Sequence, residues 1–259
     1  MSDKTFNKQV AIVTGAGQGI GFEIARQLAL QNAGVILNDI NEGLAKKAAE
    51  SIRSEGGNVY AMAGDSGDIS FIQNMVDEAV KRFGKLTIAI ANCGITIHGD
   101  FFEFKKDDFE KLVKVNLFGS FFLAQAAARQ IRKQNSGGSI LFMSSVNGLQ
   151  ANKYLSVYSM TKAGLQMLAK NLVLELSDNQ ITINSIAPGA TVTERACLEQ
   201  NDFEGVWAGI TPLKKIAQPI DIANAALFLV APTSRHITGQ CLVVDGGWTS
   251  TSPSPNKTV

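Results

Sequence analysis

The chain has 259 residues, of which 45% are hydrophobic and 18% are charged, and its formal net charge is +1. This balance provides material for a substantial core, and the scattered lysines and arginines exclude the basic stripe that nucleic-acid binding needs. Cys93, Cys197 and Cys241 lie far apart without a C-x-x-C pair, so we expect a reducing compartment and no disulfide framework. With only two histidines, His98 and His236, no metal site is expected.

The first residues, MSDKTFNKQV, contain no apolar segment of a secretory signal. No apolar run approaches the ~20 residues that span a bilayer. We therefore expect a cytoplasmic protein that does not contact membranes.

Short apolar runs rich in β-branched residues alternate with segments of helical periodicity. We expect strands at 10–14, 35–39, 59–63, 86–92, 139–144, 181–187 and 241–245. The helical segments between them include 20–31, 43–54, 69–82 and 157–176. Because such alternation is typical of a parallel sheet covered on both faces, the sequence predicts a doubly wound α/β fold of about seven strands.

The chain shows no internal repeat and no linker rich in proline and glycine. We expect one domain over residues 1–249 and a loose polar tail over 250–259. The longest interruption, residues 191–219, is expected to be either a functional or a disordered loop, and its Trp207 is expected to be exposed.

A glycine-rich turn, TGAGQGIG, follows the first predicted strand. Gly15, Gly19 and Gly21 fit G-x-x-x-G-x-G rather than the commoner G-x-G-x-x-G. Glycines let the backbone approach a pyrophosphate, and the N-terminus of the next helix offers N–H groups and a positive dipole end. The alternative is a glycine-rich turn that binds no ligand.

Asp39 ends the second predicted strand, eighteen residues after Gly21. A carboxylate there can accept hydrogen bonds from both hydroxyls of an adenosine ribose. The alternative is that Asp39 only caps the helix that begins near Asn41.

Tyr158 stands four residues before Lys162 in SVYSMTKAG, so the two share one face of a predicted helix. A free phenol ionises near pH 10, and only about one in a thousand is anionic at pH 7. A tyrosine that exchanges protons near neutral pH therefore needs a neighbouring cation, and Lys162 is placed to supply it. The pair by itself is also common on ordinary helices.

Together these motifs resemble the compact form of the short-chain dehydrogenase/reductase family, from Val10 to Thr249. NCGI (92–95) stands where the family usually has N-A-G, and APGATVT (187–193) carries Thr191 where a branched apolar residue is more common. VNLFG (115–119), MSSV (143–146) and ITGQCLVVDGGWT (237–249) match further family motifs. The resemblance implies a single-domain Rossmann fold and reversible hydride transfer between a nicotinamide cofactor and a secondary alcohol or ketone.

The resemblance also implies roles for four residues. Tyr158 is the general acid and base, and Lys162 stabilises its anion and holds the nicotinamide ribose. Ser145 hydrogen-bonds the substrate oxygen, and Asn116 orders a water that leads protons to Lys162. An asparagine inside a helix is otherwise unfavourable, which fits a local distortion. Singly, Ser145 could satisfy its own backbone and Asn116 could be a structural buried residue.

The cofactor is expected along the carboxyl ends of the strands. The residues implied to bind it are Gly15, Gln18, Gly19, Ile20, Gly21, Asp39, Asp65, Ser66, Asn92, Gly94, Tyr158, Lys162, Pro188, Gly189, Thr191 and Thr193. We predict NAD rather than NADP, because the Asp39 carboxylate would repel a 2′-phosphate. The nearby Gln18 and Ile40 are uncharged, so they do not offset the negative charge of Asp39. For Asp65 the alternative is a turn, with Asp68 capping the next helix.

The substrate pocket is expected to take its walls from 96–99, 146–155 and 191–215. Besides Ser145 and Tyr158, the predicted substrate contacts are His98, which could instead be a surface residue, and Asn147. Asn152, Tyr154 and Trp207 are the other polar or aromatic residues expected in these walls, and Trp207 could form a lid or pack against a neighbouring subunit.

These polar walls favour a sugar, polyol or sugar acid. The alternative is a 3-oxoacyl thioester, for which a basic rim of Lys105, Lys106, Lys214 and Lys215 would suit an acyl carrier. A catalytically silent nucleotide sensor and a dehydratase or epimerase are further alternatives. The former is disfavoured by the complete set of four residues, and the latter by the lack of room for a larger substrate domain.

The helices 116–130 and 156–176 are apolar beyond one face. In the family these helices form one dimer interface, and the final strand with its flanking helix forms the second. A homotetramer is therefore expected.

Overall fold

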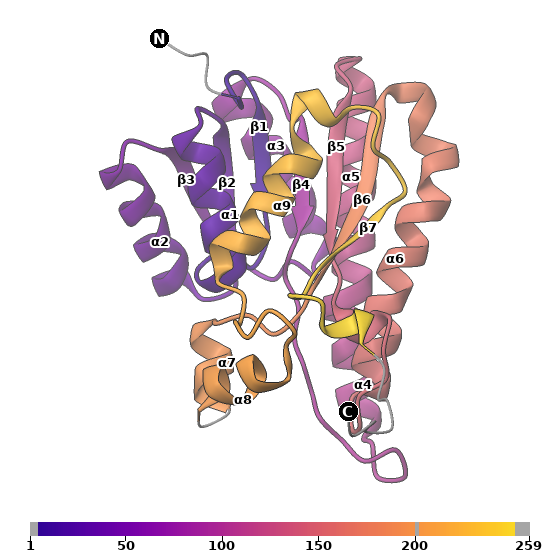
Figure 1. Ribbon diagram of the computed structural model, residues 1–259. Coiled ribbons are helices and arrows are strands. Elements are labelled where there is room, and N and C mark those ends of the chain that lie inside the picture. Colours follow the sequence, from indigo (N-terminus) through magenta and orange to yellow (C-terminus); the bar gives the residue numbers. More distant parts are fainter. Residues whose placement is uncertain (1–4, 200–201, 252–259) are drawn as a thin grey trace.

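The computed structural model describes residues 5–199 and 202–251, and its centre is one parallel sheet of seven strands in the order β3-β2-β1-β4-β5-β6-β7 (Figure 1). The strands are β1 (Val10–Val13), β2 (Gly34–Asp39), β3 (Asn58–Ala63), β4 (Ile88–Ala91), β5 (Gly138–Met143), β6 (Ile181–Pro188) and β7 (Cys241–Val244). The predicted doubly wound Rossmann fold is confirmed. Each strand lies within two residues of its predicted bounds.

Helices cover both faces of the sheet (Figure 1). One face carries α1 (Gly19–Leu30), α2 (Glu42–Ser54) and α9 (Pro219–Val230), and the other carries α3 (Ile69–Phe83), α5 (Gly119–Gln134) and α6 (Ser156–Leu176). The helix predicted from residue 116 is interrupted at its start, because α4 (Lys106–Val113) leads into a π-helical turn, η1 (Lys114–Phe118), before α5.

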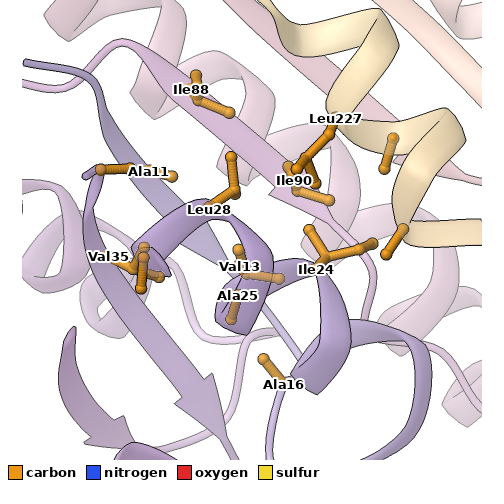
Figure 2. Packing of buried hydrophobic residues seen from close by; sticks show 14 of the residues in the cluster. Ala11, Val13, Ala16, Ile24, Ala25, Leu28, Val35, Ile88, Ile90 and Leu227 are labelled. Atoms are coloured by element: carbon orange, nitrogen blue, oxygen red, sulfur yellow. The ribbon is translucent and has the colours of Figure 1, made fainter. Parts of the chain in front are cut away.

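The core is divided by the alternation of side chains along each strand. Val13 of β1 and Ile90 of β4 point toward α1 and α9, where Ile24 and Leu227 meet them (Figure 2). Ile12, one residue earlier, belongs to the cluster on the opposite face. Full burial of an aliphatic side chain contributes about 1.5–3 kcal/mol, so this packing fixes the start of α1 against the end of β1.

The segment 191–219 differs from the predicted loop, since it contains two short helices, α7 (Glu194–Glu199) and α8 (Phe203–Ile210). Both lie beyond the carboxyl edge of the sheet (Figure 1). Trp207 was predicted to be exposed but is half-buried, because its ring packs against Trp248 at a centroid distance of 5.6 Å.

Residues 252–259 of the predicted tail lie outside the described residues. In the part of the chain that the structure describes, no helix combines the length and apolarity needed to cross a membrane.

Candidate active site

A cleft of about 720 Å³ lies at the carboxyl edge of the sheet, where the strands β1, β2, β4, β5 and β6 end. The structure brings most of the predicted site residues together here. Those that line the cleft are Gly15, Gln18, Gly19, Ile20, Gly21, Asp39, Asn92, Gly94, His98, Ser145, Asn147, Tyr158, Lys162, Pro188, Gly189, Thr191 and Thr193. Asp65, Ser66 and Asn116 do not line it.

The conformation of the glycine-rich turn depends on positive φ angles at two glycines and on hydrogen bonds from Asn92. Gly15 and Gly19 adopt φ values of 59° and 61°, which side chains rarely tolerate. Asn92 Nδ2 donates to the carbonyl oxygens of Thr14 and Gly15, each at 2.9 Å. A Cβ at Gly21 would collide with the Asn92 amide and with the Gly15 carbonyl. Asn92 thus lines the cleft while its amide positions the turn.

Asp39, at the end of β2, hydrogen-bonds the glycine-rich turn at Gly17. Its Oδ2 accepts the Gly17 N–H at 3.0 Å and its Oδ1 accepts the Asn41 N–H at 2.9 Å. The N-cap of α2 is Asn41, whose side chain accepts the Leu44 N–H at 3.0 Å. Asp39 therefore does not cap this helix.

Asp65 and Ser66 were predicted to bind the cofactor, but they lie outside the cleft-lining set. Asp65 Oδ1 accepts the Gly67 N–H at 2.7 Å and Oδ2 accepts Lys114 Nζ at 3.2 Å. The hydrogen bond from the Gly67 N–H is the main cause that holds the pKa of the Asp65 carboxyl below its usual range, and Lys114 adds to the effect. Asp68 caps α3 through the N–H groups at its start. Asp65 thus forms a turn with Gly67 and Asp68 caps α3, while cofactor binding by Asp65 and Ser66 stays a prediction.

Lys162 lines the cleft with a buried ammonium. Only 4% of the residue is exposed, and Nζ donates to the Met143 carbonyl at 2.8 Å. Nζ lies 5.6 Å from the centroid of the Tyr158 ring. Among the described residues, no carboxylate forms an ion pair with Lys162. Gly94 leaves room for this ammonium, since a Cβ there would lie 3.1 Å from Nζ.

Asn116 lies fully buried in the π-helical turn η1, behind the cleft wall. Its Oδ1 accepts the Ile95 N–H at 2.9 Å, and its Nδ2 donates to Ile95 O at 3.0 Å and to Thr161 Oγ1 at 3.1 Å. Short π-helical turns occur often at functional sites, so the predicted helix distortion is present at the predicted residue. Asn116 ties the loop after β4 to helix α6.

Ser145 lies just after β5 and is 8% exposed. Its Oγ accepts the Asn147 N–H at 3.2 Å. Asn147 in turn accepts a hydrogen bond from Asn152, which stands behind it rather than in the cleft. Tyr154 does not line the cleft either, whereas His98 lies exposed at its mouth.

An aromatic wall (Phe203, Trp207 and Trp248) also lines the cleft. Trp207 contacts Trp248 edge-on at 5.6 Å and Phe203 at 6.1 Å. Asp245 shapes the turn that carries Trp248, accepting N–H groups of Gly247 at 2.8 Å and Thr249 at 2.7 Å. Burial alone would raise the pKa of Asp245, but the hydrogen bonds from Thr249 and Gly247 outweigh it and hold the pKa below its usual range.

Comparison with known proteins identifies the family. A family model described as enoyl-(acyl carrier protein) reductase matches residues 15–249. L-rhamnose 1-dehydrogenase (NAD(P)(+)) of a Sphingomonas strain is 34% identical, over 94% of this chain and 97% of its own. The chain is a short-chain dehydrogenase/reductase. This confirms the family that the motifs predicted, and with it the broad class of oxidoreductases.

Other members of the family are similarly close. The 7α-hydroxysteroid dehydrogenase of Escherichia coli is 35% identical over 92% of both chains. A solved structure of 7α-hydroxysteroid dehydrogenase with NADH and 7-oxo glycochenodeoxycholic acid superposes with a TM-score of 0.89 at 34% identity, covering 95% of this chain and 97% of the other. A short-chain dehydrogenase/reductase from Mycobacterium marinum gives a TM-score of 0.90 at 28% identity, covering 96% and 99%.

Phe203 and Trp248 of this short-chain dehydrogenase/reductase line the cleft although neither was among the predicted site residues. The available signal was an aromatic residue directly after the D-G-G turn, together with one in a long irregular segment. No group of three or more His, Cys, Asp or Glu residues within 5–199 and 202–251 is arranged to hold a metal ion.

Proposed function

We propose that the protein is an NAD-dependent oxidoreductase that interconverts a secondary alcohol and a ketone, with Tyr158 as the proton donor and acceptor. The observation that carries this proposal is the buried Lys162 ammonium, which has one carbonyl partner and faces the cleft beside Tyr158. Removing an ammonium from water without a carboxylate partner is costly, so a purely structural lysine is a poor explanation. Positive charge at this point stabilises a phenolate on the neighbouring tyrosine.

The residues around the glycine-rich turn fit a dinucleotide. The backbone of Gly15 and Gly19 offers the open, positive-φ path that a pyrophosphate needs, and the start of α1 supplies N–H groups. The Asp39 carboxylate, already oriented by two backbone N–H groups, is available to the adenosine ribose hydroxyls. A bound nicotinamide supplies the acceptor or donor of the hydride.

The protein's own groups then handle the proton. In alcohol oxidation Tyr158 Oη takes the hydroxyl proton, and in ketone reduction it returns one to the carbonyl oxygen. Ser145 Oγ donates a hydrogen bond to the same substrate oxygen. Lys162 stabilises the negative charge on Tyr158. Asn116 hydrogen-bonds Thr161 of α6 and so holds the loop after β4 beside the helix that carries Tyr158 and Lys162.

The wall residues support a cyclic, hydroxylated substrate. Phe203, Trp207 and Trp248 offer flat apolar surfaces to the cleft, and Asn147 and His98, which also line it, offer hydrogen-bonding groups. A sugar ring has an apolar C–H face and polar hydroxyl edges, which this combination matches. We therefore propose a sugar, polyol or sugar acid, in line with the rhamnose dehydrogenase among the relatives.

A 3-oxoacyl thioester is the second candidate, and the description of the matching family model favours it. The basic rim that would attract an acyl carrier is the weaker part of this hypothesis. Lys106 pairs with Glu110 at 3.4 Å and Lys214 donates to Gly209 O at 2.9 Å. Neither lysine lines the cleft.

Initial-rate assays of the wild type with NAD and sugars, polyols and sugar acids, and with NADH and a 3-oxoacyl thioester, test the substrate class. Higher kcat/KM on the thioester than on every sugar, polyol and sugar acid would reverse the order of the two candidates. The chemistry is tested with Tyr158→Phe and Lys162→Met, each expected to lose about a thousandfold in kcat while staying folded. Tyr154→Phe, outside the cleft, is the control. A Tyr158→Phe enzyme with a tenth of wild-type activity would exclude the mechanism.

A further inference from the structure

A second cavity, of about 700 Å³, lies at the opposite end of the sheet, where the strands begin. We call it the amino-edge cavity; it is formed around the amino ends of β4, β5 and β6 and the turn after α9, at the upper end of the sheet in Figure 1.

The charge of this lining has one sign. It includes Lys85, Arg235 and His236 but no aspartate or glutamate, and Asp178, next to the lining residue Ser177, is not part of it. Of the residues that line the cavity, only Lys85 and Arg235 carry a permanent charge, and both are positive.

The two permanent cations lack protein partners. Neither Lys85 nor Arg235 forms an ion pair or a side-chain hydrogen bond with any residue of 5–199 or 202–251. Lys85 is nevertheless half-buried, unlike the exposed Lys46 and Lys81, which both pair with glutamates. Arg235 and His236 are exposed. An anion bound between Lys85 and Arg235 would give each of these two cations a counter-charge.

Hydroxyl-bearing residues form part of the remaining walls. Ser139 and Thr182 hydrogen-bond each other at 2.9 Å through their hydroxyls, which leaves one of these two protons for a ligand. The hydroxyls of Ser136, Ser177 and Thr238 donate to backbone carbonyls of the protein. A free hydroxyl and two cations are groups that bind carboxylate or phosphate oxygens by hydrogen bonds. The volume is that of a site for a small organic molecule rather than for a single ion.

We infer that the amino-edge cavity is a second binding site, for a small molecule that carries two or more carboxylate or phosphate groups. The site is separate from the catalytic cleft, because β4 and β5 run from this cavity to Asn92 and Ser145 at their other ends. Occupation of the cleft by cofactor therefore leaves the cavity open.

The test is calorimetric titration of the full-length protein, saturated with NAD, with citrate and separately with inorganic phosphate. Saturable binding of one anion per chain is expected, and the tighter of the two probes shows whether carboxylate or phosphate is preferred. Lys85→Ala and Arg235→Ala are each expected to weaken binding about tenfold, since each removes a charge-assisted contact. Lys85→Arg, which keeps the charge, should retain most of the affinity.

Lys47→Ala is the matched control, because Lys47 is an exposed lysine on α2 that lies outside both cavities. Thermal unfolding of each variant verifies that it is folded before titration. Absence of saturable binding for both probes would overturn the inference. So would equal affinities in Lys85→Ala, Arg235→Ala and Lys47→Ala.

Discussion

The backbone N–H of Gly17 donates a hydrogen bond of 3.0 Å to Oδ2 of Asp39. A Cβ at position 17 would lie 2.7 Å from this same oxygen, so the glycine and the carboxylate require each other. The end of β2 is thereby joined to the glycine-rich turn after β1. This contact fixes a negative charge at the end of the cleft where an adenosine ribose would lie.

That charge predicts a preference for NAD over NADP. A 2′-phosphate beside Asp39 would place like charges together, and at about 4 Å in a medium of effective dielectric constant ~20 the repulsion approaches ~4 kcal/mol before screening. Allowing for solvent at this half-exposed site, we expect kcat/KM to favour NAD by about a hundredfold. Initial rates with both cofactors measure it, and a ratio near one would contradict the prediction.

Variants of the same position sharpen the test. Asp39→Ala should lower the ratio of kcat/KM with NAD to kcat/KM with NADP. The double variant Asp39→Ala, Gln18→Arg should shift the preference toward NADP. Asp65→Ala is the matched control: it removes a carboxylate at the end of the next strand, which lies outside the cleft and pairs with Lys114. Its cofactor ratio should equal that of the wild type.

Gly94→Ala should slow catalysis with little effect on folding. The new Cβ would lie 3.1 Å from Lys162 Nζ and 3.4 Å from Asn116 Oδ1, so the ammonium must shift by a few tenths of an ångström. A misplacement of this order costs about tenfold in kcat. Gly209→Ala, where a Cβ meets nothing within 4 Å, is the control and should retain wild-type kcat. Unchanged kcat in Gly94→Ala would show that the Lys162 position is not critical.

Cys93 should be alkylated slowly near neutral pH and faster as pH rises. Burial raises the pKa of the Cys93 thiol, although a hydrogen bond with Ser66 opposes the shift. Since a thiol with the ordinary pKa of about 8.5 is only a few per cent ionised at pH 7, the reactive fraction of Cys93 is smaller still. Mass spectrometry after iodoacetamide treatment should find the exposed Cys197 modified first. Because Cys93 lines the cleft, added NAD should slow its modification further, and equal rates with and without NAD would contradict this placement.

The assembly is predicted to be a tetramer of 27.7 kDa chains. Helix α6 exposes 58% of Met167 and 85% of Leu174, and α9, which packs next to the edge strand β7, exposes 55% of Phe228. Apolar surface of this kind is normally covered by another protein surface. Light scattering at micromolar concentration should give about four chain masses, and a monomer mass would refute the prediction.

Two substitutions separate the predicted interfaces. Leu174→Glu and Phe228→Glu should each convert tetramers to dimers, and the double variant should be monomeric, since each places a charge in a different apolar interface. Ile69→Glu, at the exposed start of α3, is the control and should remain tetrameric. A tetramer that survives both single substitutions would exclude these two surfaces.

Much of the site was predictable because its signals are local. The glycines of 14–21 mark a turn between a strand and a helix, and Tyr158 and Lys162 share a helix face by their spacing alone. The strand order then brings these segments to one edge, since parallel strands with right-handed crossovers end on the same side. Asn116 belongs to the same group, because an asparagine within a helical pattern already indicated the distortion now seen as η1.

The sequence by itself determined the order of the elements, the two-sided sheet and the residues at the strand ends, because periodicity and glycine placement act within a few residues. Only the tertiary structure decided what those residues face. Trp248 lines the cleft because the turn that carries it is held in place by two contacts of Thr249. The Thr249 N–H donates to Asp245, and the Thr249 carbonyl accepts a hydrogen bond of 3.2 Å from Gln150 Nε2, 99 positions away. Asp65 does not line the cleft, and its partner there is Lys114, 49 positions away. Such contacts depend on chain segments that meet only after folding, and no local pattern encodes them.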